Sequence, residues 1–71
     1  MWEYCTVVCT WKGRGFTQEI DTLYKNGEEM KQFTGELWSD FLNQMGRERW
    51  ELITSNMLPS NFVITIFKRS I

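Results

Sequence analysis

The sequence predicts an α+β fold of two layers, in which one amphipathic helix packs on an antiparallel sheet of four to five strands. Three observations lead to this prediction. Strand-like runs lie at both ends of the chain, an Asn-Gly pair separates two further extended segments, and a single stretch shows helical periodicity. The 71 residues suffice for one domain, so we expect residues 1–71 to fold as a unit.

The first strand is predicted over residues 2–11, because aromatic and β-branched residues fill this run and the glycines of "KGRG" follow it. Successive side chains of a strand point to opposite faces of the sheet. One face carries Trp2, Tyr4, Thr6 and Val8, and the other carries Cys5, Val7, Cys9 and Trp11. Neither face is strongly polar, so the pattern leaves open which one meets the helix.

A β-hairpin is predicted around Asn26 and Gly27, the residue pair that accepts positive φ at both central positions of a type I′ turn. A two-residue loop places Lys25 opposite Glu28, which pairs opposite charges. The same register aligns apolar residues of the two strands, and this agreement supports the turn.

The helix is predicted over about residues 34–46, with Thr34 as the N-cap and Gly46 as the left-handed residue that ends it. Apolar side chains recur at the spacing of one helix face, at Leu37, Trp38, Phe41, Leu42 and Met45. One helix covers one face of the sheet only.

Two final strands are predicted, "WELITSNM" and "NFVITIFKR", joined by a short connection that suits an antiparallel hairpin. In the last strand we expect Phe62, Ile64 and Ile66 to form the core face. The opposite face, with Val63, Thr65 and Phe67, is still two-thirds apolar.

Composition restricts the classes of function. Eight basic and nine acidic residues give a formal net charge of −1, which provides no overall attraction for nucleic acid or an anionic membrane. No stretch resembles a secretory leader or a membrane span, so we expect a cytoplasmic protein that does not bind membranes. Nothing in the sequence calls for a cofactor.

Two motifs stand out, "MWEYCTVV" at residues 1–8 and "GRERWELI" with "ITIFKR" within residues 46–69. They resemble the N-terminal W-E-Y-x-V-V strand, the G-x-x-G-W-E-L-V element and the closing F-K-R strand of a family of small bacterial and phage proteins of unknown function. The positions on this pattern are Trp2, Glu3, Tyr4, Gly46, Trp50, Glu51, Leu52, Phe67, Lys68 and Arg69. Arg49 stands where the family usually has glycine, and Cys5 where it commonly has a charged residue. The resemblance implies a small α+β fold and a bacterial or phage origin, and it assigns no activity.

The C-x-x-x-C spacing of Cys5 and Cys9 does not favour a metal or redox site. Four residues along a strand span about 13 Å, too far for a disulfide or for two ligands of one zinc ion. The chain has no histidine to complete a metal site or to activate a serine or threonine nucleophile. The acidic residues of the hairpin and helix are expected on the solvated surface. We therefore expect neither catalysis nor a bound metal.

The second face of the sheet indicates an interface, because so many of its side chains are apolar. The residues predicted to line this interface are Cys5, Val7, Cys9, Trp11, Ile53, Val63 and Phe67. A two-fold dimer that packs sheet on sheet would give a 71-residue chain the additional burial that its small core lacks. The sequence thus favours a non-enzymatic interaction module that forms a homo-oligomer, most simply a dimer. The same apolar surface would also suit a different protein as partner.

The alternative hypothesis is a protein that binds a nucleotide or single-stranded nucleic acid. Lys12 and Arg14 in the "KGRGF" loop would contact phosphate, while Trp11 or Phe16 would stack on a base. The net charge of −1 disfavours this hypothesis relative to self-association.

Overall fold

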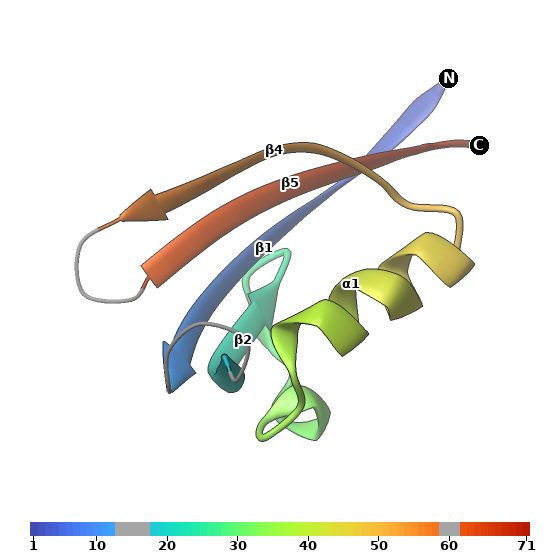
Figure 1. Cartoon of the computed structure of the whole chain (residues 1–71). Helices are drawn as coiled ribbons and strands as arrows, with labels where there is room; N and C mark the ends of the chain where they lie inside the picture. The colour runs from blue at the N-terminus through green and yellow to red at the C-terminus, as the bar shows by residue number, and fades with distance from the viewer. Residues whose placement is uncertain (13–17, 59–61) are drawn as a thin grey trace.

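The computed structural model describes residues 1–12, 18–58 and 62–71 of the chain. Along the chain, the elements are β1 (Trp2–Lys12), β2 (Glu19–Lys25), β3 (Glu28–Glu29), the 3₁₀ helix η2 (Lys31–Phe33), α1 (Trp38–Arg47), β4 (Glu51–Leu58) and β5 (Phe62–Ser70). The strands form one antiparallel sheet in the order β3-β2-β1-β5-β4. Helix α1 lies on one side of this sheet (Figure 1). The predicted two-layer α+β fold is confirmed.

The two terminal strands, β1 and β5, lie side by side in the centre of the sheet (Figure 1). They pair from Trp2 opposite Ser70 to Thr10 opposite Phe62. At the end of this ladder, the backbone N–H of residue 71 donates a hydrogen bond of 3.1 Å to the carbonyl of residue 1. Pairing between the first and last segments makes the sheet depend on contacts that are distant in sequence.

The hairpin between β2 and β3 has the predicted turn. Asn26 and Gly27 have φ angles of 53° and 85°, and Lys25 pairs with Glu28. Asn26 adds a second function, because its Oδ1 accepts a hydrogen bond of 2.9 Å from the backbone N–H of Thr6 in β1. The extended segment after the turn is shorter than expected, since β3 has only two residues before η2 begins.

The segment that follows β3 covers the outer edge of β2. The backbone N–H of Met30 donates to the carbonyl of Leu23, and that of Gly35 donates to the carbonyl of Ile20, both at 2.8 Å. In return, the N–H of Ile20 donates to the carbonyl of Glu36 at 2.8 Å. This edge of the sheet therefore has backbone partners from its own chain.

The N-terminus of helix α1 lies three residues later than predicted. Thr34 is not the N-cap, since Leu37 occupies that position and the helix starts at Trp38. The delay follows from the contacts with β2 just described and from a hydrogen bond of 3.0 Å between the N–H of Trp38 and the carbonyl of Gln18. Tertiary hydrogen bonds hold the chain before Trp38 out of the helix.

The C-terminus of α1 also differs from the prediction. Gly46 is inside the helix, and the left-handed residue is Arg49, with φ of 69°. The N–H of Trp50 donates to the carbonyl of Met45 at 3.0 Å, and that of Arg49 donates to the carbonyl of Gly46 at 2.9 Å. These two bonds form a Schellman motif, in which the buried side chains of Met45 and Trp50 occupy its usual apolar positions. The unusual backbone geometry is present at residue 49 without a glycine.

The hydrophobic core lies between α1 and one face of the sheet. Its centre is Phe41, whose ring stacks at 5.3 Å on Trp38 and makes edge contacts with Phe33 at 5.0 Å and Phe67 at 6.4 Å. The buried apolar residues are Cys5, Val7, Cys9, Trp11, Ile20, Leu23, Phe33, Phe41, Met45, Trp50, Val63 and Phe67. Most of the core therefore comes from the helix, from alternate residues of β1 and β5, and from Ile20 and Leu23 of β2, which lie on either side of an irregularity in the β1–β2 ladder.

The core face of β5 is the opposite of the one predicted. Val63, Thr65 and Phe67 are buried, whereas Phe62, Ile64 and Ile66 lie half-buried on the other side of the strand. Thr65 is the buried polar residue of this row, and its hydroxyl is 3.1 Å from the Ser55 hydroxyl. This hydrogen bond allows a polar side chain to lie beneath the helix layer.

Candidate interaction surfaces

The interface residues predicted from sequence mostly belong to the core, so this assignment is wrong. Helix α1 packs on the face of β1 that was expected to bind a second copy. Cys5, Val7, Cys9, Trp11, Val63 and Phe67 are all buried within the single chain. Of the predicted set, only Ile53 is exposed, with 47% of its surface accessible. The reason is that α1 packs on the face of the sheet that carries Cys5 and Cys9.

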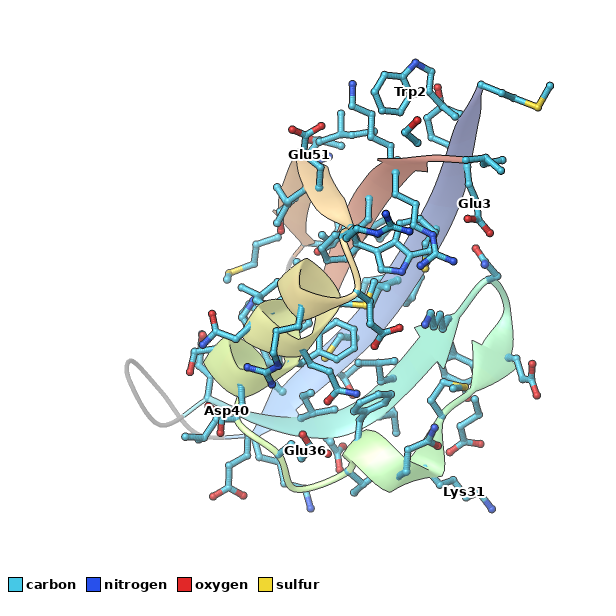
Figure 2. All side chains as sticks on the ribbon, turned by 90° about the vertical axis from the view of Figure 1, so that its right-hand side faces the viewer. Trp2, Glu3, Lys31, Glu36, Asp40 and Glu51 are labelled. Atoms are coloured by element: carbon cyan, nitrogen blue, oxygen red, sulfur yellow. The ribbon has the colours of Figure 1, made fainter. Side chains whose placement is uncertain are left out.

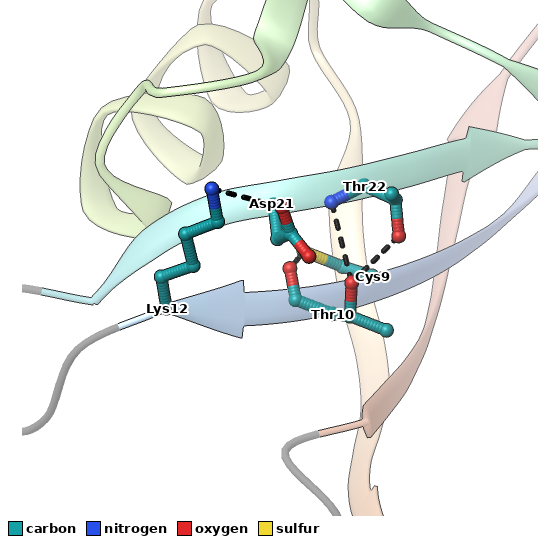
Figure 3. Close-up of polar contacts among 5 residues, drawn as sticks. All are labelled: Cys9, Thr10, Lys12, Asp21 and Thr22. Carbon is teal, nitrogen blue, oxygen red and sulfur yellow. Dashed lines mark hydrogen bonds and ion pairs between the residues drawn. The ribbon is translucent and has the colours of Figure 1, made fainter.

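Both cysteines are free thiols in the core. Burial is the main cause of a raised pKa for the Cys5 thiol, and it raises the pKa of the Cys9 thiol to about 12. The Cys9 thiol donates a hydrogen bond of 3.5 Å to the carbonyl of Thr10 (Figure 3). A protonated, inaccessible thiol is a poor nucleophile and a poor metal ligand.

The side of the sheet that faces away from α1, here called the open face, has its own apolar centre. Residues directly opposite each other in neighbouring antiparallel strands point to the same face. The rows on the open face are Trp2 and Ser70; Tyr4, Lys68 and Glu51; Thr6, Ile66 and Thr54; Glu29, Tyr24, Val8, Ile64 and Asn56; Thr22, Thr10, Phe62 and Leu58; and Glu19 and Lys12. Its centre consists of Val8, Ile64, Ile66 and Phe62, all half-buried.

Large exposed side chains surround this apolar centre. Tyr4, Tyr24 and Leu58 are 60%, 39% and 42% exposed, respectively. Thr10 and Thr22 share a hydrogen bond of 2.6 Å between their hydroxyls, and the Thr10 hydroxyl also accepts one of 3.2 Å from the Thr22 N–H (Figure 3). An apolar centre with a polar border, together with nearby aromatic side chains, is typical of a protein interface.

Ion pairs lie at both ends of the open face. At one end, Lys68 Nζ is 3.9 Å from Glu51 Oε2 and 4.3 Å from the centre of the Trp2 ring. At the other end, Lys12 Nζ is 3.3 Å from Asp21 Oδ1 (Figure 3). Each of these two lysines has a carboxylate partner, and Glu19 opposite Lys12 and Glu29 opposite Tyr24 add further acidic groups at the β2–β3 border. This distribution differs from the continuous basic surface that binds a phosphate backbone.

The outer edge of β4 is the second unusual surface. Within residues 1–12, 18–58 and 62–71, no strand pairs with this edge, because β4 is the last strand of the sheet. Seven of its eight residues are exposed, and Thr54 is half-buried. The exposed apolar side chains are Leu52, Ile53, Met57 and Leu58. The sequence "ELITSNML" contains no lysine, arginine or proline, the residues that commonly protect an edge strand.

The alternative ligand loop is only partly described. Arg14 and Phe16 lie outside the described residues, so their part of the hypothesis is untested. Lys12 is exposed and forms the ion pair with Asp21, and the Trp11 ring packs at 5.6 Å on Trp38 in the core. Trp11 is therefore not a free stacking surface for a base.

The carboxylates do not converge on one site. Figure 2 shows Glu36 and Asp40 at the opposite end of the molecule from Glu51, while Glu3, which pairs with Arg69, lies apart from all three. In the described part of the chain, no group of three or more potential ligands is placed to hold a metal ion, and no pocket is found. Glu51 forms an ion pair with Lys68 across β4 and β5.

Among the described residues, no helix has both the length and the apolar character needed to span a membrane. The chain matches no protein-family model, no curated protein and no solved structure in the comparisons with known proteins. The family resemblance at the two ends of the chain stays a prediction.

Proposed function

We propose that this protein is a small non-enzymatic interaction module that forms a homo-oligomer through the open face of its sheet. The observation that carries this proposal is the uncharged apolar centre formed by Val8, Ile64, Ile66 and Phe62 on the face opposite α1. A contiguous apolar patch bordered by polar residues is characteristic of an interface. The cysteine face no longer has this role, since α1 covers it.

A second copy of the chain is the occupant that best fits this face. The apolar centres of two copies carry no charge and do not repel each other, while the additional carboxylates of the face, Glu19 and Glu29, lie at its β2–β3 border. Two open faces related by a two-fold axis would pack about 10 Å apart, as the layers of a β-sandwich do. The single helix layer of a 71-residue chain is the reason that such a contact is favourable.

The test is the molar mass of the protein in solution. Multi-angle light scattering after gel filtration should give the unchanged protein a mass of at least twice the 8.5 kDa of one chain. Ile64→Lys should lower this mass, because it places a charge in the centre of the open face. Asn43→Lys is the matched control, since it adds the same charge to an exposed position on α1.

Circular dichroism should show that both variants retain the native secondary structure. A monomeric mass for the unchanged protein at micromolar concentration would contradict the proposal. So would an Ile64→Lys variant that is folded and retains the full oligomeric mass.

A further inference from the structure

The two edges of the sheet differ in how far the chain itself covers them. On one side, β3 has two residues, both of them glutamates, and the segment up to Glu36 bonds to the remaining backbone of β2. On the other side, the eight residues of β4 have no backbone partner at their outer edge among the described residues. A long edge strand with exposed backbone groups is a template for another strand.

Exposed apolar side chains on both faces of β4 also favour pairing with another strand. Leu52 and Met57 pair with Phe67 and Val63, which places them on the same face as α1, yet both are exposed. Leu58 is exposed on the open face. Apolar surface thus borders the edge on both sides of the sheet, and a paired strand would cover it.

We infer that β4 pairs antiparallel with β4 of a second copy, so that two chains share one continuous ten-stranded sheet. The charge pattern favours a copy in this orientation, because Glu51 is the single charged residue of the strand and lies at one end of it. Antiparallel pairing keeps the two Glu51 side chains at opposite ends of the contact, roughly 20 Å apart, whereas parallel pairing would place them side by side.

The area of the open face supports the same arrangement. From Tyr4 to Thr10, and across β2, β1, β5 and β4, this face measures roughly 20 Å by 19 Å, on the order of 400 Å² for each chain. Two such faces bury about 800 Å², which is small for a stable interface. The two chains that pair through β4 are related by a two-fold axis perpendicular to the sheet. Their open faces therefore lie on the same side of the ten-stranded sheet, which has twice the open-face area of one chain. Two ten-stranded sheets would then bury about 1,600 Å² face to face, the standard size for a specific interface.

The inference therefore rests in part on the proposed function and leads to a tetramer with two kinds of contact. One contact is the β4 edge and the other is the open face. The expected mass is about 34 kDa, four times that of the 8.5 kDa chain. Because the two contacts use different residues, each can be removed separately.

The edge is tested with Ile53→Lys/Met57→Lys, which places two lysines on each β4 and brings like charges together in the paired strands. Its control is Asn43→Lys/Ile71→Lys, with the same added charge on exposed residues outside β4. Ile64→Lys should give about 17 kDa, half the mass of the tetramer, because the β4 contact remains. The edge variant keeps only the smaller open-face contact, so its mass should be about 17 kDa in concentrated protein and fall toward 8.5 kDa on dilution. The combination of both should give the 8.5 kDa monomer. The control should keep the full mass.

The outcomes separate the two proposals. If the folded edge variant keeps the mass of the unchanged protein, pairing through β4 is wrong, while a loss of mass in Ile64→Lys still supports the open face. If Ile64→Lys keeps the mass and the edge variant halves it, the open-face proposal fails and the edge contact stands. A monomeric unchanged protein overturns both.

Hydrogen exchange of the unchanged protein provides a test without substitutions. In a paired edge strand, all backbone N–H groups of β4 have partners, so they should exchange as slowly as those of the central strand β1 in concentrated protein. In an unpaired edge strand, alternate N–H groups point to solvent and exchange rapidly. Rapid exchange at alternate positions of β4 in the concentrated sample would overturn the inference.

Discussion

Arg69 Nε lies 2.7 Å from Glu3 Oε1, and this ion pair joins two residues that are directly opposite each other in β5 and β1. The same guanidinium donates from Nη1 to the carbonyl of Glu48 at 3.2 Å and lies 4.2 Å from the centre of the Trp50 ring. Arg69 thereby connects the two central strands to the residues that follow α1. This contact set lies at the end of the sheet where the two chain ends meet.

Replacement of Arg69 should measurably destabilise the fold. We expect Arg69→Ala to lower the free energy of unfolding by about 1–2 kcal/mol, from the lost cation–π contact, the lost hydrogen bond and a partly screened ion pair. Arg69→Lys keeps the positive charge but not the planar set of donors of the guanidinium. The stability of this variant should therefore lie between those of the unchanged protein and Arg69→Ala. Urea denaturation measures both values. Lys31→Ala, at an exposed position in η2, is the control, and equal losses in all three variants would refute this role of Arg69.

Two glycines should respond to alanine in opposite directions. Gly27 has φ of 85° and open space around it, so Gly27→Ala should cost about 1 kcal/mol from backbone strain alone. Gly46 is inside α1 with equally open space, so Gly46→Ala should stabilise the protein by about 0.5–1 kcal/mol. Thermal melting of the two variants against the unchanged protein measures the sign of each effect. Two shifts of the same sign would contradict this explanation.

The order of elements and the hairpin turn could be predicted from the sequence because their signals are local. The choice between the two faces of the sheet could not, because both faces of β1 and β5 are largely apolar. Thr65 directed the prediction toward the wrong face, since its hydrogen bond to Ser55 is a tertiary contact that the sequence does not show. If the wrong face of a strand is assigned to the core, every buried residue of that strand is predicted to be exposed and every exposed residue to be buried.

The helix boundaries were missed for a related reason. Hydrogen bonds from the segment before Trp38 to β2 decide where α1 begins, and these contacts are distant in sequence. At the other end, glycine at position 46 suggested a stop, but the chain adopts the left-handed conformation three residues later, at Arg49. The unprotected edge of β4 had a visible signal, the absence of lysine and proline in "ELITSNML".

The conformation of Arg49 makes a stabilising substitution predictable. With φ of 69°, Arg49 carries the strain of a side chain in the left-handed region, which costs roughly 1–2 kcal/mol. Arg49→Gly removes this strain but adds freedom to the unfolded chain, so we expect a net gain of about 0.5–1 kcal/mol. Arg47→Gly, two residues earlier and inside α1, should instead cost about 1 kcal/mol. Urea denaturation of both variants is the measurement, and a loss of stability in Arg49→Gly would contradict it.

Burial of Cys9 predicts a loss of stability at alkaline pH. The pKa of this thiol is about 12 in the folded protein, against an ordinary value of 9.0. Below pH 9 the thiol is protonated in both states, so its contribution to stability is fully present. As the pH rises from 9 toward 12, the unfolded chain ionises first, and the free energy of unfolding falls by up to about 1.4 kcal/mol per pH unit.

Urea denaturation at a series of pH values from 8 to 10.5 measures this slope. Cys9→Ala should start at a lower stability, because a small cavity remains in the core, but its stability should decline less steeply with pH. The remaining slope includes Cys5, whose pKa burial also raises, and it should decrease again in the double variant Cys5→Ala/Cys9→Ala. An equal slope in all three proteins would show that the thiols are not responsible. Rapid reaction of the native protein with a disulfide reagent at pH 8 would contradict their burial, because only an accessible thiolate reacts.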